Sequence, residues 1–265
     1  MENEKVKKVV REGYAEVAKK GNCCCGQGVS EKLGYSKEEL RSLPEGADLS
    51  LGCGNPVAMA SLKEGETVLD LGSGPGMDCF LAARKVGKRG RVIGVDMTPE
   101  MLDKARENVR KGKFGNVEFR LGEIENLPVA DSAVDVVISN CVVNLSPDKP
   151  RVFGEAFRVL KPGGRLMVSD IVLLKPLPDA VKKSVKAYVG CLAGAAMKGA
   201  YLTAIEDAGF EKVKVVDETR FPLDLMVSDP TAKAVMKEAN IRAKDMKRIE
   251  NTVASVKVSA VKPKG

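Results

Sequence analysis

The chain has 265 residues, of which 44% are hydrophobic, so it can form one large globular domain with an appendage. It contains no histidine, which excludes any mechanism that depends on a histidine base or ligand. Its seven cysteines follow a charged start that does not resemble a secretory signal. We therefore expect a cytoplasmic protein whose cysteines serve metal, metalloid or redox chemistry rather than a disulfide framework.

The net charge of +7 is concentrated near the end of the chain, where residues 231–265 carry nine basic and three acidic side chains. This segment has no aromatic residue that could stack on a base, so we interpret it as a solvated helix face and expect no nucleic-acid partner. The most apolar stretch, residues 134–145, is much shorter than the roughly 20 residues of a spanning helix. We therefore expect no membrane segment.

Two helices separated by a cysteine cluster are predicted in the first part of the chain. Apolar residues recur at helical spacing over residues 6–17, which predicts a first helix that stops at Gly21. Three consecutive cysteines follow at positions 23–25 in a loop-like patch. Ser36 and Glu39 then have the spacing of a capping box, which predicts the start of a second, short helix.

Strands and helices alternate from Glu66 onward. This alternation predicts a parallel, doubly wound sheet with right-handed crossovers. Two further alternating stretches near the end can close the sheet with an antiparallel edge. The predicted strands cover residues 67–72, 91–97, 117–121, 134–139, 166–173, 212–216 and 254–261, and the predicted helices cover residues 77–86, 149–160, 180–208 and 230–250, with a further helix that starts at Pro99.

A glycine-rich turn follows the first predicted strand in the segment Asp70-Leu71-Gly72-Ser73-Gly74-Pro75-Gly76. Glycines let the backbone approach a ligand closely at the carboxyl ends of parallel strands. Asp96 ends the next strand, where a carboxylate can accept both ribose hydroxyls of an adenosine ligand. A nicotinamide dinucleotide site is the alternative, but it would need the spacing Gly-x-Gly-x-x-Gly, and it does not explain the acid Asp70.

The glycine turn with Asp70 resembles the first motif of class I S-adenosylmethionine-dependent methyltransferases. Three later features fit the same family in the right order: Gly122-Glu123-Ile124 after the third strand, Asn140 at the end of the fourth, and a Lys-Pro-Gly-Gly turn before the fifth. The resemblance implies that S-adenosylmethionine is the cofactor. The residues that it places at the cofactor are Asp70, Gly72, Ser73, Gly74, Gly76, Asp96, Met97, Glu123, Ile124 and Asn140.

Cys53, Cys141 and Cys191 lie in three different places that can converge on this predicted cofactor pocket. Cys53 stands in a Gly-Cys-Gly turn before the sheet, Cys141 follows the fourth strand, and Cys191 interrupts a helical pattern. One cysteine alone would more often be a small buried hydrophobe. Three together favour a soft, thiophilic centre. A trigonal set of thiolates suits trivalent arsenic, whereas zinc would need a fourth ligand such as water or Cys25.

The remaining cysteines have less definite roles. Cys79 lies on the helix after the glycine turn, and we interpret it as a packing residue. Side chains of the consecutive Cys23, Cys24 and Cys25 diverge, so they do not suit a single ion. They can capture or deliver a substrate, or exchange disulfides with the inner cysteines. An exposed, redox-labile patch is an equal alternative.

The chain resembles arsenite methyltransferases over most of residues 11–220. The Ser139-Asn140-Cys141 and Cys191-Leu192-Ala193-Gly194-Ala195 segments carry the specific part of this resemblance. It implies that Cys53, Cys141 and Cys191 bind arsenic and are catalytic. The fold that we predict is an α/β, doubly wound, mostly parallel seven-stranded class I methyltransferase sheet with an N-terminal helical appendage and a C-terminal extension.

Three segments are expected along the chain. Residues 1–50 form the helical appendage with the cysteine cluster, residues 51–180 form the S-adenosylmethionine-binding core, and residues 181–265 form the arsenic-binding region with the closing strands.

The implied reaction moves a methyl group to trivalent arsenic, whose lone pair needs no general base, in agreement with the absence of histidine. The expected partners are arsenite or its thiol conjugates and a thiol reductant of the thioredoxin or glutathione type, and the expected role is detoxification. Two alternatives stay open: a methyltransferase for a small organic acceptor such as a quinone precursor, and a metalloid sensor or sequestering protein with a vestigial cofactor pocket.

Overall fold

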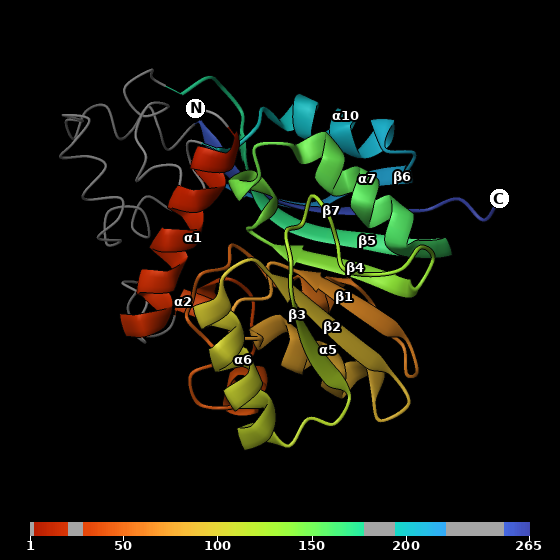
Figure 1. The fold of residues 1–265 in the computed structure, drawn as a ribbon. Coiled ribbons are helices and arrows are strands. Elements are labelled where there is room, and N and C mark those ends of the chain that lie inside the picture. Colours follow the sequence, from red (N-terminus) through yellow and green to blue (C-terminus); the bar gives the residue numbers. More distant parts are fainter. Residues whose placement is uncertain (1–2, 21–28, 178–193, 221–251) are drawn as a thin grey trace.

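The computed structural model describes residues 3–20, 29–177, 194–220 and 252–265, and Figure 1 shows how their helices and strands are arranged. Helices form on the predicted segments at residues 6–17, 77–86 and 149–160 and from Pro99, and the capping box of Ser36 and Glu39 is present at the start of α3. Three short helices, at residues 29–32, 56–59 and 143–145, were not predicted. The described helices are α1 (Asn3–Lys20), α2 (Val29–Lys32), α3 (Lys37–Arg41), α4 (Pro56–Met59), α5 (Met77–Val86), α6 (Pro99–Gly112), the 3-10 helix η1 (Val143–Leu145), α7 (Lys149–Val159) and α10 (Lys198–Asp207).

One seven-stranded sheet forms the centre of the protein, with the strand order β3-β2-β1-β4-β5-β7-β6. The first five strands are parallel, and β7 runs antiparallel to both β5 and β6. The predicted class I methyltransferase fold is therefore confirmed, including the antiparallel edge. The strands are β1 (Thr67–Leu71), β2 (Arg91–Asp96), β3 (Val117–Leu121), β4 (Val134–Asn140), β5 (Leu160–Leu173), β6 (Glu211–Arg220) and β7 (Val253–Val261).

Helices cover both faces of the sheet, with α5 and α6 on one face and α7 and α10 on the other (Figure 1). On the first face, Phe80 stacks against Phe114 with ring centroids 4.6 Å apart. On the second, Phe153 meets Tyr201 edge to face at 5.4 Å. A parallel sheet is buried on both faces, which explains why its strands consist of near-continuous apolar runs.

The N-terminal helix α1 lies beside α6, across the ends of the central strands (Figure 1). Its apolar stripe is buried, with Val10 and Ala18 each 1% exposed. Ala18 packs with Leu49 and Met101, the latter on α6. The helix thus forms a wall over the carboxyl ends of the strands, where an α/β sheet binds its ligand.

The structure extends the fifth strand beyond its predicted bounds of 166–173. Leu160 already pairs with Val134, and the register then shifts so that Val136 pairs with Arg165. The Pro-Gly-Gly turn that was predicted as a stop is accommodated as an irregularity inside the strand, and Gly163 there has φ +78°. Thr98 stands at the N-cap of α6 as predicted, but its side chain makes no capping hydrogen bond.

Several predicted features lie outside the described residues: the cysteine cluster at 23–25, Cys191, the charged helix at 230–250 and the first part of the helix at 180–208. The last part of that helix is present as α10. Within the described part of the chain, no helix has the length and apolar character needed to cross a membrane.

Candidate functional site

The glycine turn between β1 and α5 adopts a backbone conformation that its glycines permit. Gly72, Gly74 and Gly76 all have positive φ, at +67°, +52° and +98°. A Cβ on Gly72 would collide with Val142 from the loop after β4, so glycine is needed there for close packing. The backbone N–H of Gly74 donates to Asp96 Oδ2 at 2.9 Å, which joins the glycine turn to the end of β2.

Asp96 holds two backbone segments at once. Its Oδ1 accepts a hydrogen bond from the N–H of Thr98 at 2.8 Å, while its Oδ2 accepts the one from Gly74. Burial raises the pKa of this carboxyl, and the backbone hydrogen bonds oppose that rise. Each carboxylate oxygen has a second lone pair, so Asp96 can still accept hydroxyl donors from a ligand.

A cavity, partly open to solvent, lies beyond the carboxyl ends of β1, β2 and β4. It is closed on the far side by α1, which contributes Lys7, Val10 and Tyr14. Its position beyond the carboxyl ends of parallel strands is that of a cofactor pocket. The predicted cofactor residues that line it are Asp70, Gly72, Ser73, Gly74, Asp96, Met97, Ile124 and Asn140.

Two predicted cofactor residues do not line this cavity. Gly76 is the N-cap of α5 and has the left-handed conformation that begins that helix. Glu123 lies in a neighbouring groove between α1 and the end of β3. Its Oε2 accepts a hydrogen bond from Lys7 Nζ at 2.6 Å, an ion pair that fastens α1 to the core.

Four carboxyl groups line the cavity: Asp70, Asp78 and Glu125 are buried, and Asp96 is half-buried. Burial and the neighbouring Asp78 raise the pKa of Asp70 well above its usual value. Burial also raises the pKa of Asp78 to about 6, against the hydrogen bonds from Tyr35 and Asn140. A cationic ligand placed between these groups would gain favourable electrostatic energy.

The donor set of the cavity fits S-adenosylmethionine, which carries a sulfonium and an ammonium group. The carboxyls suit these cations, and the apolar residues Met77, Met101 and Ile124 form a wall that suits an adenine ring. Ser73 Oγ is buried without a hydrogen-bond partner in the described structure, so a polar ligand group can pair with it.

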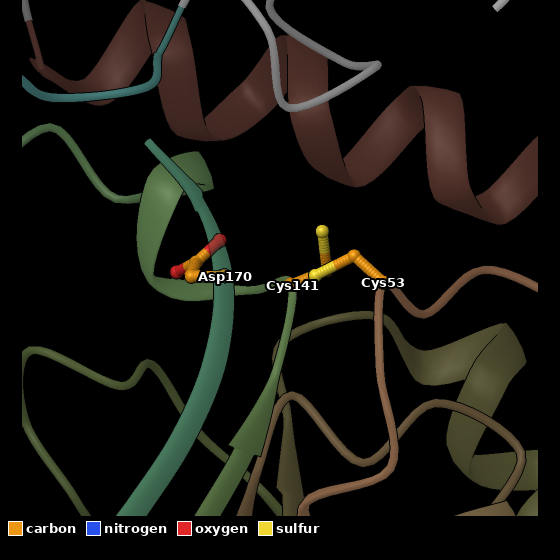
Figure 2. Close-up of side chains that lie close together, drawn as sticks. All are labelled: Cys53, Cys141 and Asp170. Atoms are coloured by element: carbon orange, nitrogen blue, oxygen red, sulfur yellow. The ribbon is translucent and has the colours of Figure 1, made fainter. Parts of the chain in front are cut away.

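Cys53 and Cys141 converge beside this cavity, and Figure 2 shows them with Asp170. Their sulfurs and a carboxylate oxygen of Asp170 all lie within 4.8 Å of one another. Cys53 comes from the loop before β1, Cys141 from the end of β4 and Asp170 from β5. Both cysteines are thiols outside any disulfide, and they are 3% and 6% exposed. The pair can bind a thiophilic atom beside the cavity, because Cys141 also lines the cavity.

Cys141 has φ +61°, a left-handed conformation that costs energy for a residue with a Cβ. It persists because its N–H donates to the carbonyl of Ser169 at 2.8 Å on the neighbouring strand. Such strained positions are frequent at functional sites. The strain turns the chain sharply at the end of β4, next to the cavity.

Asp170 was missed by the sequence reasoning. Its Oδ1 accepts hydrogen bonds from Asn144 Nδ2 at 2.7 Å and from its neighbour's N–H at 3.0 Å. Its Oδ2 accepts one from the hydroxyl of Tyr201 at 3.1 Å. Burial nevertheless raises the pKa of Asp170 to about 7. The available signal was an acid inside a predicted strand that is otherwise buried and apolar.

Of the remaining cysteines, Cys79 is fully buried on α5, and its thiol donates to Asp70 Oδ2 at 3.2 Å. Cys191 lies outside the described residues, so the structure brings together two of the three predicted arsenic-binding cysteines.

Comparison with known proteins gives the class of this fold and site. The profile described as methyltransferase domain matches residues 62–209. The chain is 52% identical over 230 residues to an arsenite methyltransferase of Halobacterium salinarum, and 39% identical over 207 residues to one of Aquipseudomonas alcaligenes. These matches cover 80% and 75% of this chain. The chain belongs to the class I, S-adenosylmethionine-dependent methyltransferases.

A solved structure narrows the family further. The crystal structure of CrArsM, an arsenic(III) S-adenosylmethionine methyltransferase from Chlamydomonas reinhardtii, is 33% identical and superimposes with a TM-score of 0.67. The match covers 89% of this chain and 74% of that one. Within its class, the chain belongs to the arsenite methyltransferase family. It spans 59% of the length of the two curated relatives named above.

Proposed function

We propose that this protein transfers methyl groups from S-adenosylmethionine to trivalent arsenic that is held by the thiolates of Cys53, Cys141 and Cys191. The observation that carries the proposal is the convergence of Cys53 and Cys141, with sulfurs within 4.8 Å, beside a cavity that suits a methyl donor. Cys191 is included because the family resemblance implies a third thiolate there.

Arsenic binding needs only the thiols themselves. Arsenous acid is neutral near pH 7, and each thiol replaces one of its hydroxyl groups. The S–H and As–O bonds break, while an As–S bond and a molecule of water form. No base, oxidant or histidine is required, in keeping with a chain that has no histidine. The lone pair of arsenic stays available for a new bond.

The cavity residues hold and orient the methyl donor. When bound, S-adenosylmethionine would supply an electrophilic methyl group, to which the arsenic lone pair can donate to form an As–C bond while the C–S bond breaks and leaves a neutral thioether. Asp96 and the Gly72–Gly74 turn would hold the nucleoside part, and Asp70 the amino-acid part. Cys141 lines the cavity and would hold arsenic nearest the methyl group. Holding the two reactants in line can lower the barrier by about 7–11 kcal/mol.

Arsenic that has accepted a methyl group is formally pentavalent, so a return to the trivalent state needs two electrons. We therefore include a thiol reductant of the thioredoxin or glutathione type among the partners, and a cytoplasmic location where such reductants are abundant. Arsenite detoxification is the corresponding role.

The decisive assay mixes the reduced protein with arsenite and methyl-labelled S-adenosylmethionine. The products are separated by chromatography, and labelled methylarsenic species are expected. No labelled arsenic from a protein that still binds S-adenosylmethionine would overturn the proposal. An organic acceptor, such as a quinone precursor, would then be tested in the same assay.

The same assay also distinguishes an enzyme from the alternative, a metalloid sensor or sequestering protein. A sensor or sequestering protein would bind arsenite to Cys53 and Cys141 but would release no methylated product. The fit of the cavity to a cationic methyl donor favours the enzyme, because a sensor has no need for four carboxyls at a second ligand site.

A further inference from the structure

Asn140 makes its polar contacts with the protein, although the sequence suggests a cofactor contact. Its Oδ1 accepts a hydrogen bond from the N–H of Cys53 at 2.9 Å. Its Nδ2 donates to the carbonyl of Gly54 at 2.8 Å. The amide of Asn140 therefore clamps both sides of the peptide turn that carries the Cys53 thiol.

This clamp requires the glycines on both sides of Cys53. A Cβ on Gly52 would lie 2.5 Å from Asn140 Nδ2, so any larger residue would push the amide away. A Cβ on Gly54 would collide with the hydroxyl of Ser169. The two glycines beside Cys53 thus leave room for Asn140 and Ser169, from the neighbouring strands, to approach the backbone of the turn.

A second set of hydrogen bonds connects the clamp to the cavity wall. Asn140 Nδ2 also lies 3.0 Å from Asp78 Oδ2 and 2.9 Å from the hydroxyl of Tyr35. Tyr35 donates in turn to Asp78 Oδ1 at 2.6 Å. The Asn140 amide can satisfy these groups in one orientation, with its oxygen toward the N–H of Cys53 and its NH₂ toward the carboxylate of Asp78 and the carbonyl of Gly54.

We propose that Asn140 and Asp78 are positioning residues for the Cys53 thiol, and that their hydrogen bonds couple the methyl-donor cavity to the arsenic site. The inference deepens the proposed function and rests on it for the identity of the thiol's ligand. Asp78 and Asn140 both line the cavity, and the side-chain oxygen of Asn140 accepts the hydrogen bond from the backbone N–H of Cys53.

Loss of the clamp has a specific expected effect. Asn140→Ala leaves the N–H of Cys53 and the carbonyl of Gly54 without their partner, and Cys53 moves relative to Cys141. We expect arsenite affinity to fall about tenfold or more, the scale of a lost buried hydrogen bond. The affinity for S-adenosylmethionine should change much less, because the amide is turned toward the Cys53 loop.

An exchange of the two side chains gives a sharper test. Asn140→Asp keeps an acceptor for the N–H of Cys53 but places a carboxylate against the carboxylate of Asp78. Asp78→Asn alone places two amide donors against each other. The double variant N140D/D78N restores one donor and one acceptor between positions 78 and 140. It should recover part of the arsenite affinity that each single variant loses.

Three readouts separate positioning from general damage. Arsenite binding is followed by the ultraviolet absorption of arsenic–thiolate bonds, and S-adenosylmethionine binding by calorimetry. The alkylation rate of Cys53 is measured by peptide mass spectrometry. Cys53 is 3% exposed in the structure, and we expect it to react faster in N140A. Cys79, fully buried in the same protein, should keep its rate and so reports on general unfolding.

Asn108→Ala provides the matched control variant. Asn108 is another buried asparagine, 3% exposed, but it donates to the carbonyl of Pro75 in the glycine loop. Its removal should leave the alkylation rate of Cys53 unchanged. If N140A does not fold, the N140D and double variants carry the same comparison.

The results decide between two roles for Asn140. Weaker arsenite binding with faster Cys53 alkylation, partly reversed in N140D/D78N, supports positioning. Loss of S-adenosylmethionine binding with unchanged Cys53 reactivity overturns it and makes Asn140 a cofactor ligand. If the unaltered protein binds no arsenite, the proposed function fails, whereas the alkylation rates still test the clamp.

Discussion

Cys53 and Cys141 share one hydrogen-bond acceptor, the carbonyl oxygen of Ser169. The thiol of Cys53 donates to it at 3.4 Å, and the backbone N–H of Cys141 at 2.8 Å. Ser169 lies on β5, where it pairs with Asn140 at the end of β4. The two cysteines are therefore held in place by the same strand before any ligand arrives, so a ligand that joins them has little chain entropy to overcome.

Cys141→Ser should reduce arsenic methylation at least about a hundredfold, because even a 1 Å misplacement of a reacting group can have that effect. A serine hydroxyl does not replace a soft thiolate toward arsenic. The affinity for S-adenosylmethionine, measured by calorimetry, should stay close to that of the unaltered protein. A parallel loss of cofactor affinity would argue against this role of Cys141. Cys79→Ser, at a buried thiol outside the pair, should leave arsenite binding intact.

Asp96→Asn should weaken S-adenosylmethionine binding by about 10- to 100-fold, the effect of losing charge-assisted hydrogen bonds. Both carboxylate oxygens accept backbone N–H groups, so an amide NH₂ at either position would face a donor and disturb the glycine turn. Calorimetry measures the cofactor affinity, and arsenite binding should persist. Asp103→Asn on α6 removes the same charge at a side chain that is 77% exposed, and it should change neither affinity.

The succession of strands and helices along the chain and the cofactor turn were predictable because their signals are local. Asp70, Gly72 and Asp96 each end a strand or begin a turn, and the parallel sheet brings such positions to one edge. Local spacing also marked Cys53 and Cys141 as candidates. It could not show that Asn140 would grip the turn of Cys53, a contact across 87 positions of the chain.

Two acids, Asp78 and Glu123, have partners that the sequence did not reveal, for the same reason. Asp78 begins a helix, where an acidic residue is common, and its contacts with Tyr35 and Asn140 arise only in the folded chain. Glu123 was expected at the cofactor, but Lys7 from the distant helix α1 engages its carboxylate. Sequence spacing alone does not identify a partner supplied by an appendage.

Lys7→Met should loosen α1 over the cavity. The Lys7–Glu123 ion pair is partly exposed, with the two side chains 15% and 37% accessible, so a loss of about 1 kcal/mol is expected. This corresponds to a fall in S-adenosylmethionine affinity of up to about fivefold, together with faster hydrogen exchange in α1. Lys8→Met is the matched control, because Lys8 lies next to it on α1 but is 68% exposed and, among the described residues, forms its ion pair with Glu12. Equal effects of the two variants would contradict a role for the ion pair.

The stability of this protein should depend on pH in an unusual way. The chain has no histidine, so no histidine titrates between pH 5 and 8. Two buried carboxyls titrate there instead: Asp78, whose pKa is raised to about 6, and Asp170, whose pKa is raised to about 7 and which keeps its proton over the wider range. Because the folded state holds this proton and the unfolded state releases it near pH 4, the free energy of unfolding falls as pH rises from about 4 to 7.

Asp170→Asn should remove this part of the pH dependence. Asparagine keeps an oxygen for Asn144 and for the adjacent N–H, and its NH₂ can donate to the hydroxyl of Tyr201. It carries no charge that must be buried above pH 7. The variant avoids the cost of ionising buried Asp170, which is at most about 4 kcal/mol because burial raises the pKa of Asp170 by about three units. Urea unfolding of the arsenic-free protein at pH 5 and at pH 7.5 measures the effect. The variant should match the unaltered protein at pH 5 more nearly than at pH 7.5, where it should be the more stable of the two. Parallel pH profiles for the two proteins would show that Asp170 is ionised in the folded state throughout this range.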